Sequence, residues 1–243
     1  MIQNSKVLGI VLARSGSKGL KDKNILSFMG SPLLSWPVRT LLGVAQIDKV
    51  LVSTDSEEYR DIAIREGAQV PFLRPDHLAS DNASSIDVID HAVDYLKQNG
   101  ESYSYVVLLE PTSPFTESND VLSALKMLDF NSKLADAIVG VGVVDAQHPS
   151  FLMEVSDEGL LCPFSKSDRI EPTRRQSISN LFYLDGSLYI SKIDILFDLR
   201  TFYHSRTLAK KMEKRKNIEI DSIEDFVVAE ALGKYFIKCN KTT

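Results

Sequence analysis

The densest group of residues that could do chemistry lies near the N-terminus, between residues 13 and 24. This segment reads ARSGSKGLKDKN, and it combines two glycines with four cations: Arg14, Lys18, Lys21 and Lys23. Glycines allow backbone N–H groups to approach a phosphate, and cations neutralise its charge. The segment contains neither GxxxxGK[ST] nor GxGxxG, so it is not a Walker A loop or a dinucleotide fingerprint. In a chain of net charge −5, so many cations together favour phosphate binding over a solvated basic loop.

Two carboxylates near the C-terminus, Glu219 and Asp221, could bind a metal ion. They flank Ile220 at the end of a predicted short strand, where alternation points both side chains to one face. Mg²⁺ needs few protein ligands when substrate phosphates supply the rest. The pair therefore predicts a magnesium site. The competing interpretation of Asp221 is an acidic residue favoured by the dipole of the helix that follows.

A mostly parallel sheet would position these residues. The continuous apolar run from Val7 to Ala13 predicts a central strand that is covered on both faces. Strands alternate with helices along the chain, which predicts an α/β, Rossmann-like fold with helices on both faces of the sheet. Ligands in such sheets bind beyond the carboxyl ends of the strands. Further strands are expected at 49–53, 69–72, 105–109, 137–144, 181–190 and 218–220, and helices at 57–66, 84–98, from 118 and at 222–238.

Three local signals set helix boundaries. Ser31 is expected to cap a helix with Pro32 at its first position, and Pro37 to kink that helix. Ser84 or Ser85 is expected to cap another helix.

The strand–helix order is interrupted between residues 145 and 180. This stretch contains short apolar pieces, a Glu158-Gly159 turn and a charged run over residues 166–175. We interpret it as an insertion, a hairpin used for dimer contact, within a single domain that covers residues 1–243. The protein is therefore expected to form a homodimer.

Composition narrows the class of protein. A chain of 243 residues with 44% hydrophobic and 25% charged residues is typical of a folded globular protein. Its acidic net charge argues against nucleic-acid binding. The longest early apolar run is too short to span a membrane and has no cleavage site after it, so we expect a cytoplasmic protein with no membrane partner. Cys162 and Cys239 give no disulfide framework.

Five segments in order carry a resemblance to a known family. They are LARSGSKGL at 12–20, VSTD at 52–55, RPDHLASD at 74–81 with Ser84 and Ser85, PTSP at 111–114, and IEID at 218–221. Together they resemble the CMP-N-acetylneuraminate synthetases, the cytidylyltransferases that activate nonulosonic acids. The resemblance runs from Val7 to about Ala231. It implies a nucleotidyltransferase fold and transfer of CMP from CTP to the anomeric hydroxyl of a 2-keto-3-deoxy sugar acid, with release of pyrophosphate.

The resemblance assigns a CTP-binding set. Arg14, Lys18 and Lys23 would hold the triphosphate, and Asn24 would contact the nucleotide near its ribose or phosphates. Arg74 and the loop at Ala83, Ser84 and Ser85 would face the cytosine and ribose. Asn24 could equally be a turn residue.

The resemblance also assigns a sugar-binding set: Glu110, Arg175, Tyr189, Phe202 and Tyr203. Sialic-acid members carry Gln where this chain has Glu110. Glutamate only accepts hydrogen bonds, so this difference bears on which sugar is used. Arg175, or its neighbour Arg174, would meet the sugar acid, often across a dimer. Core packing competes with function for the three aromatic residues.

The implied mechanism is in-line attack of the sugar's C2 hydroxyl on the α-phosphorus of CTP. Asp221 and Glu219 would bind Mg²⁺, and Asp221, Arg14 and Lys23 would form the catalytic set. Either Asp221 would take up the hydroxyl proton or the metal would lower the pKa of the hydroxyl so that it is lost to solvent. N-acylneuraminate is the first candidate substrate, with legionaminate, pseudaminate and Kdo as alternatives. A CTP-sensing module without activity is the remaining alternative, since the chain lacks the DxD pair of glycosyltransferases.

Overall fold

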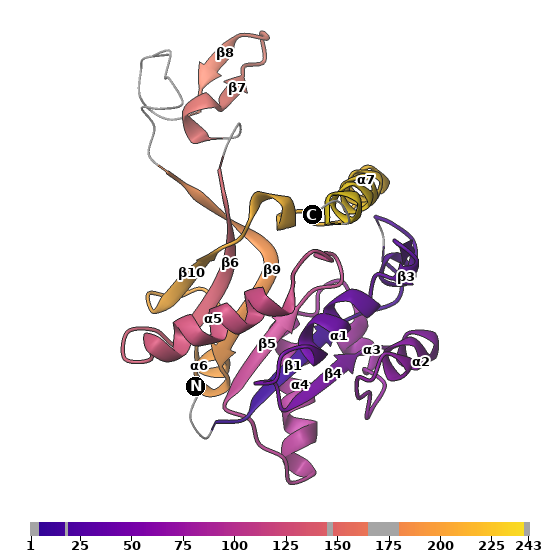
Figure 1. Ribbon diagram of the computed structural model, residues 1–243. Helices are drawn as coiled ribbons and strands as arrows, with labels where there is room; N and C mark the ends of the chain where they lie inside the picture. The colour runs from indigo at the N-terminus through magenta and orange to yellow at the C-terminus, as the bar shows by residue number, and fades with distance from the viewer. Residues whose placement is uncertain (1–4, 18, 145–147, 165–179, 241–243) are drawn as a thin grey trace.

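A six-stranded sheet forms the centre of the protein, in the strand order β10-β6-β9-β5-β1-β4 (Figure 1). The computed structural model describes residues 5–17, 19–144, 148–164 and 180–240. Strand β9 runs antiparallel between β5 and β6, and the other neighbours are parallel, which confirms the mostly parallel sheet. The strands are β1 (Val7–Leu12), β4 (Lys49–Ser53), β5 (Tyr105–Leu109), β6 (Ala137–Val143), β9 (Phe182–Lys192) and β10 (Thr207–Lys211).

Helices cover both faces of the sheet because its central strands are apolar on both sides. In β1, Val7 and Val11 belong to one buried cluster, and Leu8 and Ile10 belong to the other. Helices α1 (Ser35–Leu42), α2 (Glu57–Arg65) and α5 (Ser118–Phe130) pack on the first face, and α4 (Ser85–Gln98) and α6 (Ile193–Leu199) on the second. The continuous run at residues 7–13 is therefore a central strand, as predicted.

The helix predicted from Ser31 is wrong at its start. Ser31–Pro32 is strand β3, which pairs with β2 (Ser27–Phe28) in a hairpin. Met29 (φ 50°) and Gly30 (φ 88°) form the turn, and positive φ at both central residues is what a tight hairpin needs. Helix α1 begins only at Ser35. Pro37 consequently lies in the first turn, where its missing N–H removes no helical hydrogen bond and no kink is required.

Two predicted strands are also wrong. Residues 69–72 contribute only a single bridge, from Gln69 to Leu51. Residues 218–220 belong to no strand, and the backbone N–H of Ile220 donates to the carbonyl of Thr112 at 2.9 Å. Conversely, β10 and α6 were not predicted. Local pattern cannot tell an extended segment from a strand, because only a partner makes it one.

The last helix, α7 (Ile223–Asn240), begins as predicted. Asp225 Oδ2 accepts from the backbone N–H of Ser222 at 2.9 Å, and Ser222 Oγ accepts from the N–H of Asp225 at 3.2 Å. This reciprocal pair is a capping box with aspartate in place of glutamate. Helix α3 (Asp76–Ala79) is a single short turn.

An antiparallel hairpin of β7 (Met153–Val155) and β8 (Leu161–Pro163) stands beyond the ends of β6 and β9, away from the main sheet (Figure 1). Gly159 (φ 81°) lies in its turn, so a hairpin exists inside the predicted insertion. Its exposed apolar side chains include Val155, Leu160, Leu161 and Phe164. The charged run at 166–175 lies outside the described residues, and the homodimer stays a prediction.

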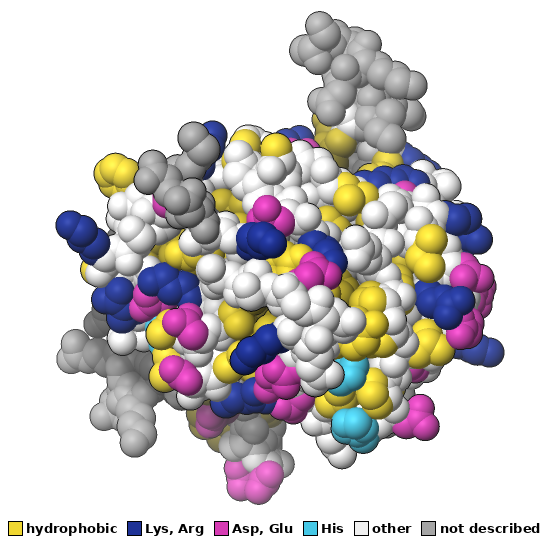
Figure 2. All heavy atoms as spheres, turned by 90° about the horizontal axis from the view of Figure 1, so that it is seen from below, with side chains coloured by type: hydrophobic (Ala, Val, Ile, Leu, Met, Phe, Trp, Pro, Cys, Tyr) yellow, Lys and Arg dark blue, Asp and Glu magenta, His cyan; other side chains and the backbone are white. Residues whose placement is uncertain are grey.

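The surface carries both signs of charge. On the face seen in Figure 2, Lys and Arg side chains are interspersed with Asp and Glu side chains. Among the described residues, no helix is long and apolar enough to cross a membrane.

Candidate active site

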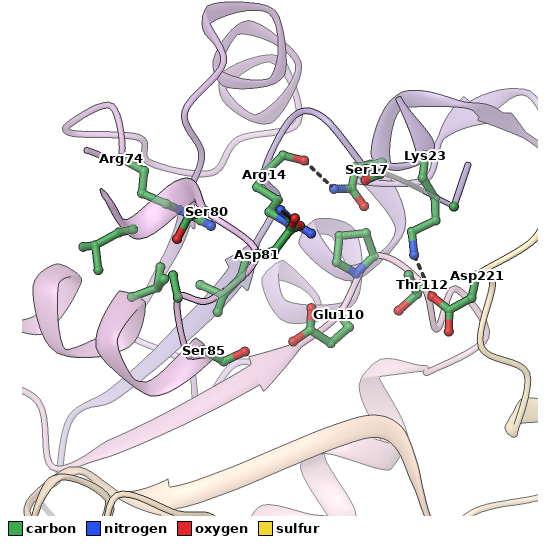
Figure 3. Close-up of a pocket in the computed structure, with 17 residues that line it drawn as sticks. Arg14, Ser17, Lys23, Arg74, Ser80, Asp81, Ser85, Glu110, Thr112 and Asp221 are labelled. Carbon is green, nitrogen blue, oxygen red and sulfur yellow. Dashed lines mark hydrogen bonds and ion pairs between the residues drawn. The ribbon is translucent and has the colours of Figure 1, made fainter. Parts of the chain in front are cut away.

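A cavity of about 460 Å³ lies beyond the carboxyl ends of β1 and β5 (Figure 3). The loop after β1, the loop before α4, the end of β5 and the segment before α7 all contribute to its wall. It brings together predicted residues that are far apart in the sequence: Arg14, Lys23, Asn24, Arg74, Ala83, Ser85, Glu110 and Asp221. The two predicted groups, the cations and the acidic residue, therefore share one space.

Hydrogen bonds to neighbouring segments fix the basic loop. Asp55, at the end of β4, accepts from the backbone N–H and from Oγ of Ser15, both at 2.7 Å. Asn24 Nδ2 donates to the carbonyl of Arg14 at 3.0 Å, and the Asn24 carbonyl accepts from the N–H of Leu34 at 2.7 Å. Asn24 is buried, so it braces the loop while it lines the cavity.

Gly19 brings this loop against the acidic segment. A Cβ at Gly19 would lie 2.9 Å from the carbonyl oxygen of Asp221, a distance that real Cβ atoms do not show. A side chain there would push the basic loop and the acidic segment apart. The glycine therefore serves the approach of two protein segments, besides leaving room for a ligand.

Both described cations of the predicted catalytic set are paired with carboxylates. Arg14 Nη1 lies 2.7 Å from Asp81 Oδ1, and Lys23 Nζ lies 2.8 Å from Asp221 Oδ1 (Figure 3). The Lys23 side chain is 14% exposed and that of Asp221 is 68% exposed. Asp81 was quoted within the RPDHLASD motif but given no role. The pairing of Asp81 with Arg14 depends on the fold, and no local sequence signal predicts it.

Arg74 is buried, and its guanidinium donates hydrogen bonds to the protein. Its Nε donates to Ser53 Oγ at 3.1 Å and its Nη2 to the Ser53 carbonyl at 2.5 Å, and only 5% of the residue is exposed. Burial lowers the pKa of Arg74 to about 10, against the opposing charges of Asp55 and Glu110. Arg74 lines the cavity, but its guanidinium also anchors this loop to the end of β4.

The neighbouring residues Ser84 and Ser85 have different roles. Ser84 caps α4, because its Oγ accepts from the N–H of Asp87 at 3.1 Å and donates to Asp87 Oδ2 at 2.7 Å. Ser84 does not line the cavity, whereas Ala83 and Ser85 do. The cap occupies the Ser84 hydroxyl, and the contact of the 83–85 loop backbone with the nucleotide stays a prediction.

The acidic segment alternates as predicted, although it is not a strand. Ile220 is fully buried, whereas Glu219 and Asp221 are exposed residues. Partial burial of the Glu219 carboxyl group, followed by the nearby charge of Asp221, raises the pKa of Glu219. Asp221 lines the cavity and Glu219 lies beside it. Two carboxylates that repel each other suit a divalent cation, which would relieve that repulsion.

The donor set fits a cation held mainly by its substrate. Among the residues that the structure describes, no three His, Cys, Asp or Glu side chains are grouped to hold a metal ion. Mg²⁺ commonly takes one or two carboxylates from the protein and completes its shell with water and phosphate oxygens. The two acidic side chains beside a cationic cavity match that arrangement.

Glu110 is a half-buried carboxyl group in the cavity wall. Burial raises the pKa of Glu110 to about 7 and the charge of Glu219 adds to this, while Arg74 and Lys23 oppose it. Near neutral pH the group is therefore divided between a form that only accepts hydrogen bonds and a form that can also donate one.

The predicted sugar-binding aromatics form a cluster next to these carboxylates. The ring centroid of Tyr189 is 5.3 Å from that of Phe202 and 6.3 Å from that of Tyr203. Burial raises the pKa of Tyr189, and so do a hydrogen bond to Tyr203 and the charges of Glu110 and Glu219. None of the three rings lines the cavity itself. Phe202 is buried in the core of the second face, so packing accounts for it.

Two predicted residues cannot be placed. Lys18 and Arg175, with its neighbour Arg174, lie outside the described residues. Thr112 lines the cavity and was missed as an individual residue, although its PTSP motif was quoted.

Comparison with known proteins identifies the family. The sequence model of the family described as Cytidylyltransferase matches residues 8–238. An N-acylneuraminate cytidylyltransferase of Streptococcus agalactiae serotype V is 34% identical over 91% of this chain and 52% of its own length. This chain thus spans about half the length of that relative. A CMP-N,N'-diacetyllegionaminic acid synthase of Legionella pneumophila is 29% identical over 93% of this chain and 96% of its own.

A solved structure supports the fold. A CMP:2-keto-3-deoxy-manno-octonic acid synthetase complexed with CTP superposes with a TM-score of 0.68, at 17% identity, over 95% of this chain and 99% of that one. The extended match of the family model and the relative at 34% identity together decide the classification. This chain belongs to the cytidylyltransferase family.

Proposed function

We propose that this protein transfers CMP from CTP to the anomeric C2 hydroxyl of a nonulosonic, sialic-acid-like sugar and releases pyrophosphate. One observation carries the proposal: Arg14, Lys23 and Asp221 line the same cavity, at the edge of the sheet where α/β proteins bind ligands. A triphosphate needs cations, and a departing pyrophosphate needs neutralisation of charge.

In this proposal, two cations bind the phosphates and one carboxylate accepts a proton. Arg14 and Lys23 exchange their carboxylate partners for phosphate oxygens when CTP enters. Both ion pairs have a partner that is a third or more exposed, and such pairs contribute about 0–1 kcal/mol, so the exchange costs little. Asp221, once released by Lys23, is the exposed carboxylate positioned to accept the proton of the attacking hydroxyl.

We propose Mg²⁺ as the cofactor, held by Asp221 together with Glu219. When bound, it would neutralise charge on the phosphates as pyrophosphate leaves. The acidic pair, with the pKa of Glu219 raised, supports a cation at this place.

N-acylneuraminate is the first candidate for the sugar because relatives at 32–34% identity carry that name. The relative named for diacetyllegionaminic acid supports the first alternative, and pseudaminate and Kdo follow. Glu110, Tyr189 and Tyr203 would contact the sugar, since they lie beside the acidic segment. The exposed apolar side chains of the β7–β8 hairpin support a homodimer, because such patches commonly mark protein contacts.

A substrate panel tests the function. The protein is incubated with CTP, Mg²⁺ and one sugar acid at a time, chosen from N-acetylneuraminate, legionaminate, pseudaminate and Kdo, and pyrophosphate release is measured. UTP in place of CTP, and CTP without sugar, are the matched controls. We expect release with CTP and at least one nonulosonic acid. Binding of CTP without release for any sugar would instead favour the CTP-sensing module.

A further inference from the structure

A partly buried polar pair joins β9 to the segment that carries the two carboxylates. Asn217 Nδ2 donates to Asp185 Oδ2 at 2.8 Å. Asp185 is 4% exposed and also accepts from the backbone N–H and Oγ of Ser187, at 3.1 and 2.7 Å. Asn217 lies two residues before Glu219, and neither Asn217 nor Asp185 lines the cavity.

Two glycines of β6 leave room for this pair. A Cβ at Gly140 would lie 2.5 Å from Asp185 Oδ1 and 2.4 Å from Ser187 Oγ. A Cβ at Gly142 would lie 2.4 Å from the Tyr183 ring and 2.5 Å from Asn217 Nδ2. Because the two glycines are two apart on a strand, they leave space on the same face of β6. The polar pair and the Tyr183 ring together occupy that space.

The acidic segment has two further attachments, one on each side of Asn217. Before it, Lys216 Nζ donates to Asp120 Oδ2 at 2.7 Å and to Glu117 Oε2 at 2.9 Å, at the start of α5. After it, the backbone N–H of Ile220 donates to the Thr112 carbonyl at 2.9 Å. Neither attachment reaches β9. Among the described residues, the Asn217 side chain links the segment to that strand through its bond to Asp185 and through a hydrogen bond with Tyr183.

Glu219 packs directly on β9 at the next position along. Gly186 (φ 70°) presents bare backbone to it, and a Cβ there would lie 3.2–3.3 Å from the carboxylate atoms of Glu219. A shift of the segment along β9 would move Glu219 off Gly186. Asn217 thus helps to fix the position on β9 of the segment that carries both carboxylates.

We infer that Asp185 and Asn217 are positioning residues that hold Glu219 and Asp221 in the geometry that binds a divalent cation. The inference rests on the proposed function of the acidic pair. Partners that orient metal-binding side chains typically change metal affinity by about 10–100-fold when they are replaced.

Three variants test the inference: Asn217→Leu, Asp185→Asn, and the exchanged pair Asp185→Asn/Asn217→Asp. Asn217→Leu removes the hydrogen bond with no change in side-chain charge at the altered position. The exchanged pair restores a donor opposite an acceptor with the net charge of the wild type. Asn99→Asp, at the far end of α4, is the control for the same amide-to-acid change. If Asn217→Leu does not fold, Asn217→Ser replaces it.

The readout is Mn²⁺ binding followed by electron paramagnetic resonance, with and without CTP, alongside CTP binding in EDTA. We expect each single variant to bind Mn²⁺ at least about tenfold more weakly, with CTP affinity in EDTA within about twofold of the wild type. The exchanged pair should recover most of the Mn²⁺ affinity, and Asn99→Asp should behave as the wild type.

Three results would overturn the inference: wild-type Mn²⁺ affinity in the single variants, no recovery in the exchanged pair, or an equal loss of CTP affinity, which would indicate general structural support. A wild-type protein that binds no Mn²⁺ in either condition would also overturn it. Failure of the proposed function is a separate result, because it would appear as no pyrophosphate release by a wild type that still binds Mn²⁺.

Discussion

The two sides of the candidate site differ in how their charges are balanced. On the side proposed for the nucleotide (the nucleotide side), Arg14 and Lys23 each have a carboxylate partner within 2.8 Å. On the side proposed for the sugar (the sugar side), Glu110 and Glu219 repel each other in partly buried positions, and Tyr189 lies close enough for both charges to raise its pKa. The cations of the first side are paired before a ligand arrives, whereas among the described residues the carboxylates of Glu110 and Glu219 are opposed only by the more distant charges of Lys23 and Arg74.

This difference indicates what each ligand must do. A triphosphate displaces carboxylates from exposed ion pairs, which is an exchange of one anion for another with a small cost. A cation or a hydrogen-bond donor on the other side relieves repulsion that the folded protein already carries. Substitutions on the nucleotide side should therefore change binding, and substitutions of the acidic groups should change chemistry and pH dependence.

Asp221 stands between the two sides, and its replacement should have the largest effect. In Asp221→Ala we expect kcat to fall by about 10²–10⁴-fold, the range found when a positioned acid–base group is removed. CTP affinity in EDTA should not weaken, because Lys23 is freed for phosphate. Steady-state pyrophosphate release and calorimetry measure the two quantities. Asp198→Ala, an exposed carboxylate on α6, is the control, and full activity in Asp221→Ala would contradict the assignment.

Arg14→Ala should give the next largest effect, and this one on binding. A hydrogen bond to a charged group contributes about 1.5–3 kcal/mol, so the dissociation constant for CTP should rise by about 10–100-fold. Cytidine, which lacks phosphates, should bind as it does to the wild type. Calorimetry with both ligands checks this, with Arg60→Ala on α2 as the control. Equal weakening for cytidine would mean that Arg14 shapes the loop and does not contact phosphate.

The sequence predicts the nucleotide side better than the sugar side, for a physical reason. The basic loop follows directly from β1, and its cations lie within ten residues, so local spacing was enough to identify it. The sugar side joins Glu110 at the end of β5 to Tyr189 on β9 and to the segment at 217–221. Those contacts depend on which strands pair. Nothing in the local sequence of β9 indicates that it runs antiparallel to both of its neighbours.

The errors in the fold have the same origin. Residues 218–220 have the pattern of a strand, yet the backbone N–H of Ile220 bonds to the carbonyl of Thr112, in the loop after β5, and the segment joins no strand. Ser31 and Pro32 match a helix start, but the turn at Met29 and Gly30 draws them into a hairpin. In each case a hydrogen-bonding partner, distant in the first case and adjacent in the second, overrode the preference of the segment itself.

The pH dependence of stability in Glu110→Gln tests whether the Glu110 carboxyl group keeps its proton in the folded protein. The pKa of Glu110 in the folded protein, about 7, lies above its ordinary value of 4.5. Between these values the unfolded chain loses the proton while the folded protein keeps it, so this group lowers stability as pH rises to about 7 and adds no further change above it.

Glutamine cannot ionise, so Glu110→Gln should unfold at nearly the same temperature as the wild type near pH 4.5. It should gain stability over the wild type as pH rises to about 7, by about 2–4 °C for each kcal/mol removed. Thermal unfolding at a series of pH values measures the difference. A constant difference across this range would show that Glu110 ionises normally, and Glu57→Gln on the exposed start of α2 is the control.

Tyr203→Phe should give the smallest effect and tests whether the aromatic cluster belongs to the sugar side. The change removes the hydroxyl that is hydrogen-bonded with that of Tyr189 and keeps the ring in place. A single neutral hydrogen bond from this hydroxyl to the sugar would contribute about 0.5–1.5 kcal/mol, so KM for the sugar acid should rise by about 2–10-fold while the dissociation constant for CTP is unchanged. Because the two hydroxyls are partners, Tyr189→Phe/Tyr203→Phe should be less harmful than the sum of the single changes. Initial rates at varied sugar concentration measure all three variants. A rise in the CTP constant instead would move the cluster to the nucleotide side and remove the distinction between the two halves of the site.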